Sequence, residues 1–345
     1  MRLTARPENP TEAAALAFNL GPVPVAHAMF GMPISRVVIA GVRLGIFQRL
    51  AKGPATSAEI ANELGLHPGG AEELLRAIAV FRFLKRSGDR YVLPRRARRW
   101  LDPASDLYVG SFIEHCADYW EWWAKLEAVV RTGEAVEIHA PGPEDPHWRR
   151  YIRGQFELAR LSAGEVARAV RLPSGATSLL DVAGGHGWFS VELCRRNPGL
   201  HATVIDLPGS AAIGREIVAD AGMSDRVNFV EGDLLSDDLG GPYDGALCFN
   251  IIHHLTPAQN TELFHRLHSV LRPGGTVAVL DLFRPPGERR MNTSALLGLF
   301  FFLTSGASTY SPNDLGQWLR DAGFSRPRAG RIKRIPGQTL YTASS

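Results

Sequence analysis

Three short apolar runs in the second half of the chain each end in a carboxylate, and the first leads directly into closely spaced glycines. The runs read "LLDVAGGHG", "VIDLP" and "EGDLL", and they contain Asp181, Asp206 and Asp233. Gly185 and Gly187 leave backbone without side chains beside the first acid, so a ligand can approach closely there. Carboxylates in such a place accept hydrogen bonds from hydroxyl or amino groups and attract cations.

Three classes of ligand can be weighed against this glycine turn. A phosphate-binding loop needs G-x-x-x-x-G-K-[ST], and no lysine or threonine stands at the required place. A dinucleotide turn, G-x-G-x-x-G/A, is nearly matched at 185–190, and Asp206 follows where a ribose-binding acid belongs. S-adenosylmethionine (SAM) explains more, because Asp206 suits its ribose, Asp181 its sulfonium and amino-acid tail, and Asp233 its adenine amine. A dinucleotide does not require all three acids, so the spacing favours SAM.

Alternating strands and helices must position these acids. From Thr177 onward, short apolar runs alternate with segments of helical periodicity, up to two terminal strands in "RPRAGRIKRI" and "QTLYTAS". This order predicts an α/β fold with a Rossmann-like, mostly parallel sheet and helices on both faces. Ligands of such sheets bind at the carboxyl ends of the strands. Residues 172–345 are therefore predicted to form a SAM-binding domain.

The N-terminal third has a different pattern. Residues 1–105 show three helical segments followed by a hairpin around "SGD", the order of a winged-helix module, and residues 106–171 read as an aromatic-rich helical connector that contributes to a substrate pocket. "LKRSGDRYVLPRRARRW" carries seven basic residues against one acid, which allows DNA binding. The helix "AEELLRAIAVFRFL" offers few groups able to read base edges, so packing against a second subunit is favoured.

Composition limits the remaining possibilities. The chain has 345 residues, is 45% hydrophobic and has a formal net charge of +3, too little to require a polyanionic partner. Its three cysteines are odd in number and widely spaced, which indicates free thiols in a reducing compartment. The N-terminus lacks the apolar core of a signal peptide, and the longest apolar run, "ALLGLFFFL", is about half of what spans a bilayer. We expect a cytoplasmic protein that binds neither membrane nor nucleic acid.

Taken in order, "LLDVAGGHG", "VIDLP", "EGDLL", "IIHHL" and "LRPGG" resemble the motifs of class I SAM-dependent methyltransferases. Together with the N-terminal module, they resemble the small-molecule O-methyltransferases of the caffeate and acetylserotonin type and their bacterial natural-product relatives. The resemblance implies a homodimer joined by the N-terminal module, SAM as cofactor, S-adenosylhomocysteine (SAH) as its product, and no metal. Ala183 stands where the family has its first glycine, and its methyl group is expected to fit if φ stays negative. The cofactor-binding positions that the resemblance implies are Asp181, Gly185, Gly187, Asp206, Leu207, Asp233 and Leu234.

The family's catalytic histidine lies in an h-h-H-D-W pattern, and here that segment reads "IIHHLTP". The resemblance places His253 on the histidine, His254 on the acid and Leu255 on the tryptophan. The family's C-terminal glutamate falls in "GASTYS", which contains no acid. His253 is then either a general base or a residue that shapes the pocket, and Asp281 is either an orienting acid or a plain loop acid. A metal held by His253 and His254 is not expected, because neighbours in extended chain point in opposite directions.

The predicted function is transfer of a methyl group from SAM to a hydroxyl of an aromatic or polyketide-like small molecule in bacterial secondary metabolism. Two alternatives stay open. Methylation of carbon or nitrogen in an electron-rich indole, enol or amine needs no strong base, and a methyltransferase scaffold can also serve as a SAM- or DNA-binding regulator. Aromatic segments around the expected pocket favour a flat acceptor. The predicted substrate-contacting residues are Trp123, Gln155, His254 and Phe302.

Overall fold

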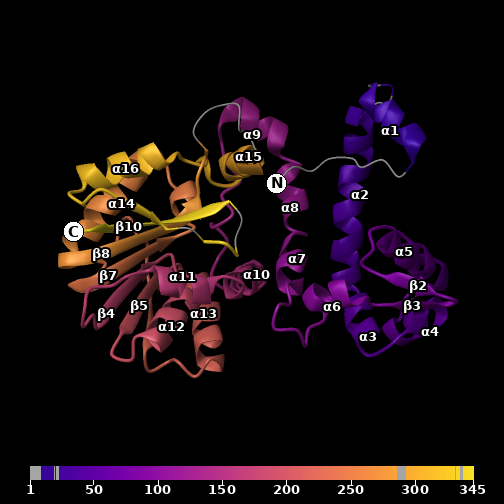
Figure 1. The fold of residues 1–345 in the computed structure, drawn as a ribbon, viewed down its shortest axis with the longest axis horizontal. Helices are drawn as coiled ribbons and strands as arrows, with labels where there is room; N and C mark the ends of the chain where they lie inside the picture. Colours follow the sequence, from indigo (N-terminus) through magenta and orange to yellow (C-terminus); the bar gives the residue numbers. More distant parts are fainter. Residues whose placement is uncertain (1–8, 19, 21–22, 286–292, 331, 335–336) are drawn as a thin grey trace. The chain divides into compact units, whose positions relative to one another are not determined.

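The computed structural model describes residues 9–18, 20, 23–285, 293–330, 332–334 and 337–345. Contacts divide the chain into two compact units, Met1–Ala117 and Asp118–Ser345, each described by itself below (Figure 1). The boundary falls inside the segment predicted to be a connector, residues 106–171. The three-part division of the chain therefore stays a prediction.

The first unit follows the predicted order of helices and a hairpin. Strands β2 and β3 pair antiparallel around Gly88, and β1 adds to β3 to give the order β1-β3-β2. Thr56 caps α4, since its hydroxyl accepts from Glu59 N and the Glu59 carboxylate accepts from Thr56 N. The elements are α1 (Pro10–Ala17), α2 (Val23–Arg43), α3 (Ile46–Ala51), β1 (Ala55–Thr56), α4 (Ser57–Leu64), α5 (Pro68–Val80), β2 (Lys85–Ser87), β3 (Arg90–Val92), α6 (Arg95–Leu101) and α7 (Gly110–His115).

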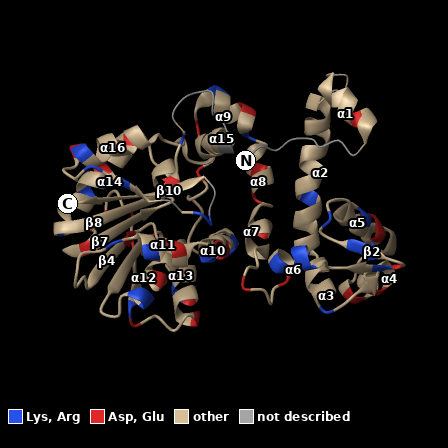
Figure 2. Ribbon diagram, in the orientation of Figure 1, with Lys and Arg blue, Asp and Glu red and all other residues tan. Residues whose placement is uncertain are grey.

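Basic side chains of this unit gather on β2 and α6, and acidic ones on α4 and α5 (Figure 2). Two of the seven basic residues in the segment considered for DNA binding form ion pairs. Arg90 pairs with Glu59 at 3.1 Å and Arg98 with Asp102 at 2.7 Å. These two guanidinium groups are already engaged by carboxylates.

Helix α2 exposes a run of large apolar side chains along its 21 residues. By length and apolar composition, α2 could cross a membrane. Core helices of soluble proteins and signal sequences can have the same length and composition. Contiguous exposed apolar surface of this kind marks an interaction site. The exposed side chains are Val25, Met29, Phe30, Met32 and Ile34.

The second unit is built on one seven-stranded sheet of order β6-β5-β4-β7-β8-β10-β9. The first five strands in this order, β6, β5, β4, β7 and β8, are parallel to one another. Strand β10 runs antiparallel to both β8 and β9. This is the predicted mostly parallel sheet. The strands are β4 (Ser178–Val182), β5 (His201–Asp206), β6 (Val227–Glu231), β7 (Tyr243–Phe249), β8 (Leu271–Leu282), β9 (Arg328–Gly330) and β10 (Gln338–Ser344).

Alternating side chains of the strands form two cores, one on each face of the sheet. In β4, Leu179 packs with α11 and α12, whereas Leu180 packs with α14 and α16 (Figure 1). Helices therefore cover both faces, as the sequence predicts. The helices are α8 (Tyr119–Trp123), α9 (Leu126–Thr132), α10 (Pro146–Arg160), α11 (Ala163–Ala169), α12 (Trp188–Arg196), α13 (Pro208–Asp220), α14 (Pro257–Ser269), α15 (Thr293–Ser305), α16 (Pro312–Asp321) and the 3-10 helix η1 (Ile252–His254).

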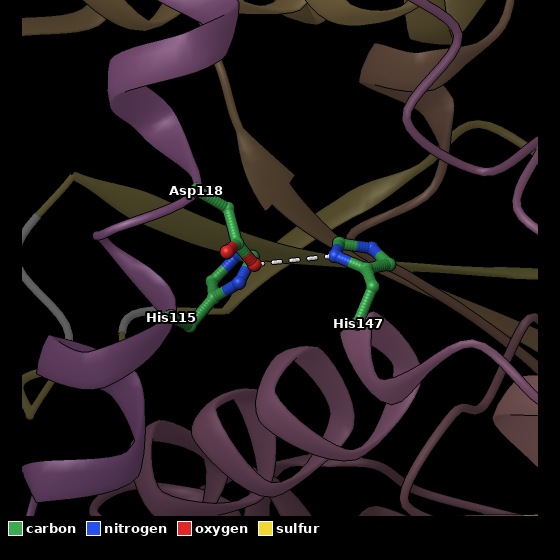
Figure 3. A group of neighbouring side chains, drawn as sticks. All are labelled: His115, Asp118 and His147. Atoms are coloured by element: carbon green, nitrogen blue, oxygen red, sulfur yellow. Dashed lines mark hydrogen bonds and ion pairs between the residues drawn. The ribbon is translucent and has the colours of Figure 1, made fainter.

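Two segments differ from the sequence-based expectation. The periodicity of the aromatic segment 111–133 predicts one helix, but the segment forms the separate helices α7, α8 and α9. Asp118, directly before α8, pairs with His147 of α10 (Figure 3). The apolar pattern of "YDGALCFNIIHHL" predicts one strand throughout, but β7 ends at Phe249 and Asn250 adopts φ 55°. His253 and His254 consequently lie on one turn of η1.

Candidate active site

Gly184, in the turn between β4 and α12, leaves no room for a side chain. A Cβ on Gly184 would lie 2.6 Å from Asp181 Cγ and 2.7 Å from Val204 Cγ1. Gly185 and Gly187 have φ of 54° and 65°, a left-handed backbone that favours glycine. The turn therefore exposes backbone next to two carboxylates.

Ala183 also adopts this left-handed backbone, with φ of 51°. The expectation of a negative φ at this position is wrong. The cause lies in the turn, because Ala183 N donates to Ile205 O at 2.8 Å in the neighbouring strand and so fixes the backbone. An alanine in this region is strained by about 1–2 kcal/mol.

Replacing Ala183 with glycine is expected to raise the free energy of unfolding by about 0.5–1 kcal/mol. The relief of strain exceeds the added chain entropy of the unfolded state, which is about 0.4–1 kcal/mol. Urea denaturation measures the change. Ala212→Gly, at an exposed position inside α13, serves as the control and is expected to lose about 1 kcal/mol. A loss of stability in Ala183→Gly would show that the turn holds no strain.

Asp206 is the last residue of β5, and its carboxylate is held by the glycine turn. Oδ2 accepts a hydrogen bond from Gly185 N and Oδ1 one from Leu207 N, both at 2.7 Å. Burial raises the pKa of Asp206 to about 6, and these bonds oppose the rise. The carboxylate is thereby fixed at the tip of β5.

Asp181 lies on the adjacent strand, and its side chain is buried. Its Oδ2 accepts from Ser190 Oγ at 2.7 Å. Burial raises the pKa of Asp181 to about 7, with a smaller contribution from the nearby charge of Asp206. Two carboxylates in low-dielectric surroundings favour a ligand that brings hydrogen-bond donors or positive charge.

Asp233 follows β6, on the other side of β5, but its side chain is exposed. Its Oδ1 accepts from Leu235 N at 2.7 Å, and its own N–H donates to Asp237 Oδ2 at 2.8 Å. Leu207 packs against the cluster around Trp148, and Leu234 against the core beneath α14. The three acids thus follow three neighbouring strands, with Asp233 the most accessible to solvent.

These features fit SAM. A partly buried carboxylate at the ribose position, a fully buried one beside it and a turn that a Cβ would fill match a nucleoside with a cationic tail. Asp206 would hold the ribose, Asp181 the tail and Asp233 the adenine side.

His253 forms a buried pair with Asp281, the acid near the end of β8. His253 Nδ1 lies 2.6 Å from Asp281 Oδ1, which also accepts from Leu282 N at 2.6 Å. A carboxylate only accepts, so Nδ1 carries a proton, and in the neutral form of the imidazole the lone pair is then on Nε2. Within the described part of the chain, Nε2 has no hydrogen-bond partner. The orienting acid that "IIHHL" and "GASTYS" lack therefore comes from β8, which pairs with β7.

His254 lies beside the pair and is held separately. Its Nδ1 is 2.6 Å from Ser305 Oγ, and its ring centroid is 4.4 Å from that of His253 and 4.7 Å from that of His139. Burial, followed by His253 and His139, holds the pKa of His254 well below its usual value. His254 is therefore neutral at physiological pH.

A further polar contact lies near Asp206. His139 Nε2 is 3.3 Å from the Tyr151 hydroxyl, and burial followed by the charge of Asp206 raises the Tyr151 pKa. The sequence pattern predicts neither residue as part of the site. A histidine in an irregular loop carries no spacing signal that could have identified it.

Aromatic side chains pack beside the histidines. Phe300 of α15 contacts Tyr119, Trp122 and Trp123 of α8, with ring centroids 4.8–6.1 Å apart. Phe302 and Trp123 are partly buried in the same cluster, and Gln155 is partly buried in α10. Trp148 is almost fully buried and donates to Gly142 O at 3.1 Å, which makes it a core residue.

Asp118 ties α8 to α10 and so supports this aromatic cluster. Its Oδ2 lies 3.3 Å from His147 Nδ1 (Figure 3). Its Oδ1 accepts from Arg150 Nη2 at 3.2 Å. Both partners lie in the first turns of α10.

Comparisons with known proteins agree with this geometry. Residues 129–325 match the family model of the O-methyltransferase domain, and residues 26–103 match that of the O-methyltransferase dimerisation domain. The chain belongs to the O-methyltransferase family. Together with solved neighbours that hold SAM or SAH, these matches make it a SAM-dependent methyltransferase.

Two curated relatives and one solved structure illustrate the similarity. The 3-hydroxy-5-methyl-1-naphthoate 3-O-methyltransferase of Streptomyces sahachiroi is 30% identical over 88% of this chain and 89% of the relative. The N,N-dimethyltransferase OxyT of Streptomyces rimosus is 30% identical over 94% of this chain and 98% of its own length. Human N-acetylserotonin methyltransferase in complex with SAM shares the fold, with a TM-score of 0.83, 20% identity and 99% of each chain covered.

The raised pKa of Asp181 leads to an expected pH dependence of SAM binding. Asp181 is mostly protonated at pH 6 and ionised at pH 8 if its pKa is about 7. A cationic ligand prefers the ionised form, so SAM affinity should rise about tenfold between these values. Calorimetry across this range measures it. Asp181→Asn should flatten the profile, and an unchanged slope in that variant would assign the titration to another group.

Proposed function

We propose that this enzyme transfers a methyl group from SAM to a hydroxyl of an aromatic or polyketide-like small molecule, in bacterial secondary metabolism. The observation that carries the proposal is the buried pair of His253 and Asp281, with Nε2 of His253 uncommitted to other described residues. A base that is oriented in this way serves an oxygen nucleophile, which must lose its proton during the transfer.

The residues of the chain divide this work between them. When bound, SAM supplies a methyl group on a positively charged sulfur that departs as the neutral sulfide. Asp206 and Asp181 fix and neutralise the cofactor, and alignment of the acceptor oxygen can lower the barrier by roughly 7–11 kcal/mol. His253 Nε2 takes the hydroxyl proton as the oxygen bonds to carbon, and Asp281 stabilises the imidazolium that results.

The class of acceptor is inferred from the aromatic cluster and from the relatives. Phe300, Phe302 and Trp123 offer flat apolar surfaces, which suit stacking of an aromatic acceptor. The relative from Streptomyces sahachiroi is named for a hydroxynaphthoate, a flat phenolic acid. The relative OxyT is named as an N,N-dimethyltransferase, so nitrogen is the alternative acceptor atom. A nitrogen or carbon nucleophile, however, needs no oriented base. The pair of His253 and Asp281 therefore favours oxygen, and nothing in the site favours a regulator.

Assembly and location complete the proposal. The match to a dimerisation domain and the exposed apolar face of α2 support a homodimer. That role also accounts for the apolar composition of α2 without a membrane. We place the enzyme in the cytoplasm, with no nucleic acid among its partners.

A screen of phenols, naphthols, enols, indoles and amines with methyl-labelled SAM tests the proposed reaction. Product mass and NMR identify the acceptor atom. Labelled methyl ethers of hydroxyarenes are expected. Products labelled only on carbon or nitrogen would overturn the assignment to oxygen, although the enzyme would remain a methyltransferase.

A further inference from the structure

The ring of Phe301 lies flat against the imidazole of His253. Their centroids are 3.8 Å apart with an interplanar angle of 22°. Both side chains are buried, with 6% of each residue exposed. The other described ring close to His253, that of His254, is 4.4 Å away and tilted by 52°. Phe301 therefore covers one face of the imidazole.

The partners of His253 fix different features of its ring. Asp281 holds one edge through Nδ1, which leaves the ring free to turn about that hydrogen bond. The parallel phenyl ring removes this freedom, because turning the imidazole would drive its edge into Phe301. The direction of the Nε2 lone pair is then set by both contacts.

The stacked ring also responds to the charge of His253. The face of a phenyl ring carries negative potential and attracts a cation, most strongly where water is excluded. A neutral imidazole receives no such attraction, so the contact strengthens as His253 takes up a proton. Interactions that grow toward the transition state accelerate a reaction, whereas uniform ones do not.

Helix α15 holds Phe301 firmly in this place. Phe300, on the preceding position, packs into the aromatic cluster with α8, and the fully buried Leu303 accepts from Val136 N at 2.9 Å through its carbonyl. Thr304 Oγ1 donates to Phe300 O at 2.9 Å within the helix. Anchors on both sides of Phe301 along the helix keep its ring from swinging away.

We propose that Phe301 is a positioning residue for methyl transfer, which aligns His253 and stabilises its protonated form through the stacked face. The proposal rests on the proposed role of His253 as the base. It assigns a rate effect to a side chain that has no polar atom.

The test is a double-mutant cycle on kcat with a phenolic acceptor from the screen, measured for F301L, H253A and the double variant. Leucine keeps apolar volume but has no π face, so F301L is expected to lower kcat about 5–30-fold while KM changes less than about threefold. In the H253A background, the same substitution should lower kcat less than about twofold. F301Y keeps the stacked ring and should retain kcat within about threefold. SAH affinity, measured by calorimetry, shows that each variant is folded.

A control separates stacking from packing of the helix. F300L removes aromatic contacts with α8 on the same helix, and its effect on kcat should be the same with and without His253. Equal losses in F301L and F301Y, or a loss in F301L that persists in full in the H253A background, would overturn the role of Phe301. If H253A alone lowers kcat less than about fivefold, His253 is not the base. The role of Phe301 would then be overturned as well, because it depends on that assignment.

Discussion

Replacing His253 with alanine is expected to lower kcat for a phenolic acceptor at least a hundredfold, while SAH affinity stays within about threefold. A positioned base typically contributes about 10²–10⁴-fold, and the contact of Nδ1 with Asp281 indicates a ring held for this task. Asp181 and Asp206, which we propose hold the cofactor, lie on β4 and β5, so their hydrogen bonds do not depend on His253. Single-turnover assays with labelled SAM measure the rate, and calorimetry measures the affinity.

Asp281→Asn is the matched control for the pair. The amide keeps the shape of the side chain but removes the charge that fixes the tautomer of His253, so kcat should fall about tenfold or more. A loss below about fivefold in His253→Ala would remove the base assignment. It would favour a carbon or nitrogen nucleophile, which sheds its proton after the transfer.

The second large effect is expected at Asp206. Alanine there removes an acceptor for ribose hydroxyls and leaves the N–H groups of Gly185 and Leu207 without their bonds. Each hydrogen bond to a charged group contributes about 1.5–3 kcal/mol. SAH affinity should therefore fall about a hundredfold, since about 1.4 kcal/mol corresponds to a factor of ten. Calorimetry at pH 8, where Asp206 is ionised, gives the clearest comparison.

Asp233→Ala provides the comparison within the same set of acids. Asp233 is exposed, so water competes for whatever it binds, and the loss in SAH affinity should stay below about tenfold. A larger loss at Asp233 than at Asp206 would contradict the assignment of the enclosed carboxylate to the ribose. Asp233→Ala should keep its thermal unfolding midpoint near that of the parent protein, whereas Asp206→Ala should lower it, because Gly185 N and Leu207 N lose their acceptor.

The sheet could be predicted from the sequence because its pattern is local. Leu179 and Leu180 face opposite cores, and the run that contains them reads as a buried strand without tertiary information. The acids at the strand ends were identified for the same reason, since each follows directly from its own strand. The strand order then brings Asp181, Asp206 and Asp233 to one region of the sheet.

Features that depend on distant segments were less predictable. Asp281 is 28 residues from His253, and only the pairing of β7 with β8 shows that they meet. The prediction that the side chains of His253 and His254 point in opposite directions assumed an extended chain. The left-handed turn at Asn250 ends the strand before them, and it has no strong sequence signature. The backbone at Ala183 was misjudged because a bond to Ile205 O in a neighbouring strand overrides the preference of alanine.

The carboxylates of Asp181 on β4 and Asp206 on β5 also affect the stability of the enzyme. Burial of these charges, followed by their mutual repulsion, weakens the fold of the free protein, and a cofactor that brings positive charge and hydroxyl donors offsets this cost. Saturation with SAM thus protects the chain against heat and proteases as well as enabling turnover. A cell that runs short of methyl donor would lose this enzyme faster, so its abundance would follow the methyl supply.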